Sequence, residues 1–206
     1  TRPAVETEVL VAYDDDHLYV AWLCYDDPAE VRASFCERDR IYSDDFVALF
    51  IDTYGDATHA YQIVVNPYGI QGDLLFSSTR GEDERYDLIF ESAGRITEFG
   101  WVVEMAVPFA SLRFPRRDEQ VWRVDFYRSR PRESRYRYAW AAYDRDEQCW
   151  PCQWGTLTGI SGIEPGAGLR LLPALVAHQA GRLGQGGSFD NGKGRADLAL
   201  GIAYDI

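Results

Sequence analysis

The sequence predicts an all-β fold, an antiparallel β-sandwich followed by a β-hairpin tail. Ten short segments alternate apolar and polar residues with the period of two that a strand requires. Turn-forming residues such as Asp26-Asp27-Pro28 separate these segments. Only 28–35 and 108–112 are briefly helical in pattern, so the strand–helix alternation of a parallel sheet is missing. Many short strands at this spacing favour a sandwich or a barrel.

The predicted strands are, in chain order, 7–13, 18–25, 46–53, 60–66, 70–77, 87–97, 101–107, 121–128, 136–143 and 155–160. In the second strand one face carries Leu18, Val20, Trp22 and Cys24, and we expect that face to point into the core. The third strand is apolar on both faces. We therefore expect it to lie centrally and to be covered on both sides.

Length, composition and charge exclude several classes of protein. The chain has 206 residues, of which 46% are hydrophobic and 26% charged, the balance of a folded domain and not of a disordered chain. No apolar run approaches the roughly 20 residues of a membrane-spanning helix. The net charge of −12 argues against nucleic acid as a partner, because phosphates attract basic surfaces. Since the first residue is Thr1 and not Met, we expect a processed chain or a piece of a longer protein.

The charges are unevenly distributed along the chain. Residues 14–56 hold twelve acids against three arginines, and residues 113–137 hold nine arginines against four acids. Either region could attract a polar ligand, or both could be solvated surface, which is the commoner outcome for such runs.

A change of composition after Pro165 predicts two domains, 1–165 and 166–206. The second holds nine glycines, and its alternating segments 169–178 and 195–206 flank a Gly-rich link at 181–194. Each segment is close to the ~9–11 residues of a membrane β-strand. The tail is therefore either the first hairpin of an outer-membrane β-barrel or a pair of edge strands of the same sheet. An apolar face ending in Tyr204, with Lys only in the link, favours the barrel.

The sequence shows no arrangement of catalytic residues. The nucleophile elbow, the HExxH zinc motif, the Walker A loop and the dinucleotide-binding glycine motif are all absent. The three histidines, His17, His59 and His178, are scattered and lack a partner at metal-ligand spacing. Carboxylate pairs could serve glycoside hydrolysis only at a suitable separation in space. We therefore predict that the protein is not an enzyme.

Cys149-Trp150-Pro151-Cys152 is a CxxC segment. Its spacing fits a tight disulfide, half of a zinc site or a redox pair. Cys24 and Cys36 could complete a zinc site, but Cys24 alternates with core residues and is expected to be buried. A structural disulfide or inert thiols is the leading interpretation, because the segment lies in a loop and not at the start of a helix.

Acidic residues flank the third predicted strand and its turn. Asp44, Asp52 and Asp56 are a candidate calcium site, since calcium takes carboxylate and carbonyl oxygens. The twelve-residue calcium-loop pattern is absent. The alternative is that these aspartates cap their own turns, as Asp commonly does.

Aromatic residues crowd one late stretch of the chain. The candidate ligand-binding residues from this stretch and the arginines before it, together with an Asn in a turn, are Tyr138, Trp140, Trp150, Trp154, Arg128, Arg130 and Asn66. Flat rings stack on the apolar face of a sugar, and Arg or Asn side chains meet its hydroxyls. The alternative is that most of these rings pack in the core.

Several segments resemble family 9 carbohydrate-binding modules. The segments concerned are YDDDHLYV (13–20), SDDFVALFID (43–52) and GWVVEMAVPF (100–109). The sequence resembles more closely a bacterial subgroup, DUF5916, in which such a module is fused to a C-terminal outer-membrane β-barrel. That pattern is echoed by VNPYGIQGD (65–73), LRFP (112–115) and WGTLTGI (154–160). The resemblance covers about residues 5–206.

The resemblance implies a jelly-roll-like sandwich of the carbohydrate-module type, a tail that begins a barrel, and the periplasm or outer membrane of a Gram-negative bacterium. It implies a non-catalytic module that binds carbohydrate, with calcium as a stabilising ion. The second hypothesis is a structural periplasmic domain that orders or plugs the barrel of the same parent protein. A third, from the haem-binding sandwich that shares this architecture, would use Met105 as an axial ligand, although Met105 alternates as a core residue.

Overall fold

The computed structural model describes residues 4–166, 169–183 and 189–204. The chain divides into two compact units, Thr1–Pro165 and Gly166–Ile206. Among these described residues nearly every regular element is a strand, and the helical elements are three single 3₁₀ turns, Pro28–Glu30, Phe109–Ser111 and Pro151–Gln153. Within the described ranges, no helix is long and apolar enough to cross a membrane. The predicted all-β fold is confirmed.

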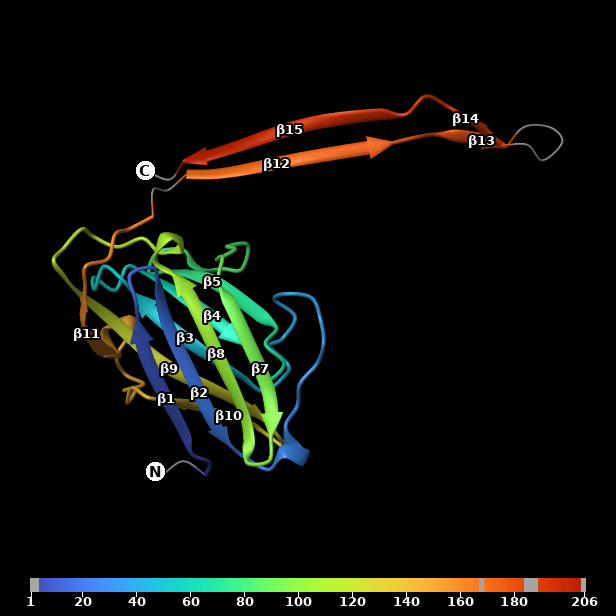
Figure 1. Cartoon of the computed structure of the whole chain (residues 1–206). Helices are drawn as coiled ribbons and strands as arrows, with labels where there is room; N and C mark the ends of the chain where they lie inside the picture. Colours follow the sequence, from blue (N-terminus) through green and yellow to red (C-terminus); the bar gives the residue numbers. More distant parts are fainter. Residues whose placement is uncertain (1–3, 167–168, 184–188, 205–206) are drawn as a thin grey trace. The chain divides into compact units, whose positions relative to one another are not determined.

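Two antiparallel sheets lie face to face in the first unit (Figure 1). The four-stranded sheet has the order β1 (Thr7–Tyr13), β2 (His17–Tyr25), β8 (Gly100–Pro108), β7 (Glu91–Thr97). The seven-stranded sheet has the order β10 (Arg135–Ala139), β9 (Glu119–Pro131), β3 (Phe46–Asp52), β4 (His59–Val65), β5 (Gln71–Ser77), β6 (Gly81–Asp83), and β11 (Gly155–Ser161) also pairs with β9. All ten predicted strands fall on these elements. The first has the predicted ends and the other nine have shifted ends, and β6 is the one strand of this unit that was not predicted.

Two of the predicted strands are several residues shorter than predicted, one at its start and one at its end. Residues 87–90 are not strand, because the Leu88 N–H donates to the buried Asp73 carboxylate and not to a neighbouring strand. Strand β10 stops at Ala139, because the Ala141 N–H donates to Asp125 at 2.8 Å. In both places a buried carboxylate takes the backbone bond that would have continued the strand.

The main core fills the space between the sheets. Its largest fully buried side chains include Trp22, Trp101 and Trp122, one from each of β2, β8 and β9. The face of β2 predicted to be internal is buried throughout. Met105 is 2% exposed within this core, so it packs as a core residue.

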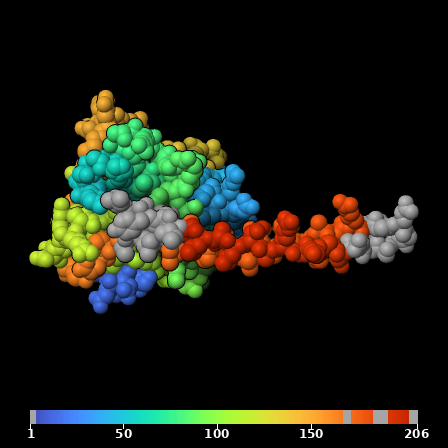
Figure 2. All heavy atoms as spheres, turned by 90° about the horizontal axis from the view of Figure 1, so that it is seen from above, coloured from blue at the N-terminus to red at the C-terminus, as the bar shows by residue number. Residues whose placement is uncertain are grey.

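The second unit is a two-stranded hairpin, β12 (Leu169–His178) with β15 (Arg195–Tyr204), extended by β13 (Gly181–Leu183) with β14 (Phe189–Asn191). Its atoms form a narrow band in the space-filling view (Figure 2). The short pair β13–β14 falls in the predicted Gly-rich link, of which 184–188 lie outside the described residues, as does the side chain of Tyr204.

Candidate functional site

A groove of about 560 Å³ lies on the outer face of the seven-stranded sheet, away from the main core. Strand β3 turns Val47, Leu49 and Ile51 towards the core, so Phe46, Ala48 and Phe50 face outward and form part of the groove. The register with β4 and β9 adds further outward-facing residues to it, among them Gln62, Val64 and Tyr127. The prediction that β3 is central is therefore right. Its outer face is covered only in part, by aromatic side chains from loops, and the groove lies between them.

Aromatic side chains from loops form the walls. Tyr42 comes from the segment before β3, and Tyr143 and Trp150 come from the loop between β10 and β11. The Trp150 ring lies 5.0 Å from Phe50, 5.5 Å from Phe76 and 4.9 Å from Trp154, between ring centroids. The result is an apolar surface of several ring planes, of the kind that buries the apolar face of a small ligand.

Polar groups lie at the two sides of this apolar surface. Arg137 is an exposed residue of β10, at one edge of the sheet, and Glu82 belongs to β6 at the other. Gln62 donates from Nε2 to Glu82 Oε1 at 2.8 Å, and Glu84 follows on the same side. Burial, followed by the charges of nearby carboxylates, Asp39 and Asp73 first, raises the pKa of Tyr42 to about 12, so its hydroxyl stays neutral and can donate a hydrogen bond.

Two constraints fix the loop that carries Tyr143 and Trp150. The Tyr143 hydroxyl donates to Asp125, a fully buried residue of β9 whose carboxyl pKa is raised by burial. Cys149 and Cys152 form a disulfide, with their Cα atoms 5.3 Å apart, on either side of Trp150. The disulfide of the CxxC segment therefore restricts the backbone that carries Trp150, a groove residue. The other two cysteines, Cys24 and Cys36, are free thiols.

A second cleft, of about 520 Å³, lies between β1 and the end of β10. Tyr138 and Trp140 line it together with Arg128, Trp22 and Val9. The Trp140 ring is 62% exposed and packs over Gly155, where an added Cβ would come within 1.9 Å of it. Three of the predicted ligand residues therefore share this cleft and not the groove that Trp150 lines.

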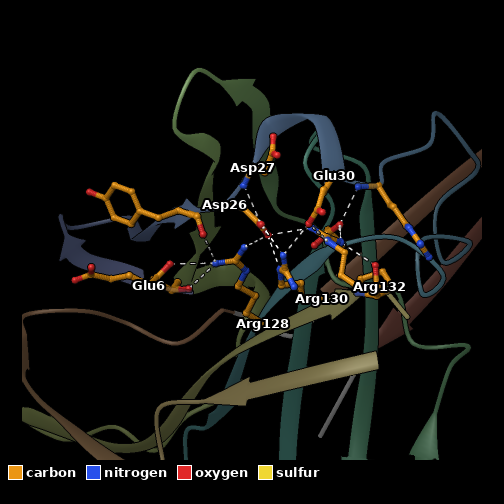
Figure 3. Close-up of polar contacts among 12 residues, drawn as sticks. Glu6, Asp26, Asp27, Glu30, Arg128, Arg130 and Arg132 are labelled. Carbon is orange, nitrogen blue, oxygen red and sulfur yellow. Dashed lines mark hydrogen bonds and ion pairs between the residues drawn. The ribbon is translucent and has the colours of Figure 1, made fainter. Parts of the chain in front are cut away.

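The arginines are held by a network of ion pairs (Figure 3). Asp26, whose side chain is 1% exposed, accepts from Arg128 at 2.8 Å, Arg130 at 2.7 Å and Arg132 at 2.9 Å. Arg132 also reaches the buried Asp45 at 2.8 Å. Some acids of the acid-rich region thus pair with arginines of the arginine-rich region, and Arg128 and Arg130 join β9 to the end of β2.

The remaining two predicted ligand residues are buried. Trp154 is 5% exposed and lies beneath the groove, stacked on Phe50 at 5.7 Å. Asn66 is fully buried, and its Oδ1 accepts from the Tyr68 and Ile70 N–H groups of the turn between β4 and β5. Both side chains stabilise the sheet and its turns and are too buried to contact a ligand extensively.

The three carboxylates proposed for calcium do not form one site. Asp44 lies just before β3 and Asp52 ends it, and β3 alone is roughly 20 Å long at the rise of a strand. Asp44 accepts from Ser34 and Asn66, Asp52 accepts from three N–H groups of its own turn, and Asp56 accepts from Thr58. These residues therefore do not fit the ion: Asp52 and Asp56 cap turns, and Asp44 ties the segment at Ser34 to Asn66.

In the described part of the chain, the acids that do gather are Asp39, Asp73 and Asp87. Arg38 already occupies this group: its guanidinium pairs with Asp73 and lies 3.8 Å from Asp87.

Comparison with known proteins places the chain in a family. The family model described as carbohydrate family 9 binding domain-like matches residues 1–158. The chain belongs to this family. A search of curated proteins found no match to this family 9 domain.

Two solved structures share the fold of this family 9 domain. One is a candidate carbohydrate-binding protein from Bacteroides uniformis, with a TM-score of 0.60 and 16% identity over 78% of this chain and 79% of that chain. The other is a family 9 carbohydrate-binding module from Caldicellulosiruptor kristjanssonii in complex with cellotriose, with a TM-score of 0.52 and 17% identity over 81% and 77%.

Sequence reasoning missed most of the groove of the family 9 domain. Phe46, Phe50 and Tyr127 are outward-facing strand residues, and Glu82, Glu84 and Arg137 complete the polar sides. The apolar second face of β3 was the available signal, since an exposed aromatic face on a central strand needs either a cover or a ligand.

Proposed function

We propose that this domain is a non-catalytic carbohydrate-binding module and that its ligand lies in the groove on the outer face of the seven-stranded sheet. The observation that carries the proposal is the combination in one groove of Phe50, Tyr127 and Trp150 with the polar side chains of Gln62, Glu82 and Arg137. Aromatic rings bury the C–H face of a sugar ring, and the amide, carboxylates and guanidinium bond its hydroxyls. Family membership and the cellotriose complex of a family 9 module support the same ligand class.

The test is calorimetry with cellotriose as the first probe, followed by a glycan array. We expect Trp150→Ala to weaken binding about thirtyfold, the effect of removing an aromatic anchor worth about 2 kcal/mol. Arg137→Gln, a change at an exposed residue, should weaken binding without altering the melting temperature. Trp140→Ala is the matched control, because it removes an exposed Trp from the other cleft. Loss of binding in Trp140→Ala but not in Trp150→Ala would place the site in the second cleft.

We also propose that the second unit is the beginning of an outer-membrane barrel, in a Gram-negative envelope, which the sandwich orders or plugs. The register of the hairpin places Leu175 opposite Leu198 and Pro173 opposite Leu200 on one face. Leu175 is 70% exposed and Leu198 82% exposed, whereas the other face carries Asp197 and His178. A wholly apolar face opposite a mixed one is the pattern of a membrane β-strand.

Limited proteolysis of the whole chain tests this second proposal. Without the remaining strands the hairpin has open edges and exposed apolar side chains, so it should be cleaved rapidly. We expect trimming to about residue 165 to leave a resistant sandwich, read by mass spectrometry. A tail as resistant as the sandwich would contradict the proposal.

A further inference from the structure

Strand β1 is an edge strand, and among the described residues no strand pairs with its outer side. It pairs with β2 from Thr7 opposite Cys24 to Tyr13 opposite Leu18, and it begins the order of its sheet (Figure 1). Within the described residues, no hydrogen bond joins the other side of its backbone to any group. A free strand edge is a template for pairing with another strand.

The direction of its backbone groups follows from the two ends of the ladder. The Tyr25 N–H donates to the Glu6 carbonyl, and the Asp14 N–H donates to the His17 carbonyl, each at 3.1 Å. In an antiparallel pair the N–H and C=O of one residue point to the same side, and the side alternates along the strand. Even-numbered residues therefore face β2, and Thr7, Val9, Val11 and Tyr13 offer their N–H and C=O groups at the free edge.

Nothing in β1 blocks pairing. Its sequence, TEVLVAY, contains no Lys and no Pro, and its register with β2 has no bulge. These are the usual devices that protect an edge. Leu10 is 61% exposed and Val11 is 38% exposed, so the edge is also apolar.

We propose that β1 pairs with β1 of a second copy of this chain, antiparallel, about a two-fold axis at Leu10. In this register Thr7 lies opposite Tyr13, and Val9 opposite Val11. All four outward-facing residues then form hydrogen-bonded pairs, and a shift by two residues in either direction loses one of them. The two four-stranded sheets become one continuous sheet.

The side chains fit this register. Glu8, the one charged residue of β1, faces Ala12 of the second copy, so the two carboxylates never oppose each other. The two exposed Leu10 side chains meet across the axis. Because one strand supplies both halves, the contact is self-complementary, as a two-fold interface requires. The contact is small, so we expect weak, concentration-dependent association.

Position-specific crosslinking tests the register. In a Cys36→Ser background, which removes the partly exposed thiol, Leu10→Cys places two thiols in a non-hydrogen-bonded pair with Cα atoms about 4.5 Å apart, within disulfide range. The matched control is Ala12→Cys, whose two copies lie roughly 13 Å apart along the strands and cannot be bridged. We expect a covalent dimer with Leu10→Cys alone. Equal crosslinking of both variants, or none with Leu10→Cys, overturns the proposal.

Sedimentation equilibrium gives an independent measurement. Leu10→Lys sets two ammonium groups against each other at the axis and should weaken self-association about tenfold or more. Glu8→Gln removes a charge that faces Ala12 and adds no Lys to the edge, so it should leave association unchanged. If the apolar hairpin drove association instead, both variants would behave like the wild type, and the proposal would fail.

Discussion

Asp26→Asn should cost about 3–5 kcal/mol of the free energy of unfolding, because it leaves several buried guanidinium groups without their common partner. The Asp26 side chain is 1% exposed and accepts from three arginines, of which Arg128 is 2% exposed (Figure 3). Urea denaturation measures the change. Glu30→Gln is the matched control: Glu30 contacts Arg130 at 3.1 Å but is 55% exposed, so its loss should cost less than about 1 kcal/mol. Equal costs for the two variants would contradict the buried network.

The same network predicts a dependence on pH. Burial alone would raise the pKa of the Asp26 carboxyl, but the hydrogen bond from Arg130 and the charges of Arg128, Arg130 and Arg132 outweigh it and hold that pKa below its usual value. A lowered pKa stabilises the folded state above the unfolded-state pKa, and this stability is lost as the pH falls through the folded-state value. We expect wild type to lose stability below about pH 4 more steeply than Asp26→Asn does.

Gly100→Ala should cost about 3 kcal/mol or more. Gly100 has φ +139°, and a Cβ there would lie 2.1 Å from the Cys24 carbonyl oxygen and 2.7 Å from the Asp26 nitrogen. Both contacts are with backbone, so relief requires β2 or β8 to move. The shift would also disturb Asp26, whose N–H donates to Phe99 at 3.0 Å.

Gly81→Ala separates backbone strain from this clash. Gly81 has φ +78° and nothing within 4 Å of its added Cβ, so the substitution should cost about 1–2 kcal/mol. Urea denaturation of both variants measures the difference. Because Gly100 and Asp26 share a neighbourhood, the double variant Gly100→Ala/Asp26→Asn should lose less than the sum of the two single losses. A cost for Gly100→Ala no larger than that for Gly81→Ala would contradict the close approach.

The aromatic residues show where sequence reasoning stops. Trp150 and Trp154 are four residues apart, yet one lines the groove and the other lies buried beneath it. Tyr138 and Trp140 line the cleft beside β1, while Arg137, the residue before Tyr138, lines the groove. Ala139 lies between them and borders both. The period of two predicts that neighbouring side chains point to opposite faces of the sheet. It does not predict which other elements pack against each face.

By itself the sequence determined the all-β class, the strand positions and the buried face of β2, because these follow from a period of two and from burial of apolar side chains, which are local properties. Only the tertiary structure decided the rest. Asp26 and Arg128 are 102 positions apart, yet their side chains pair with only 1% and 2% exposed, whereas Asp44 and Asp52, eight positions apart, lie at opposite ends of β3. An extended strand carries near neighbours in sequence far apart, and pairing between distant strands brings remote residues together, so the groove, the cleft and the ion-pair network exist only once the sheets have formed.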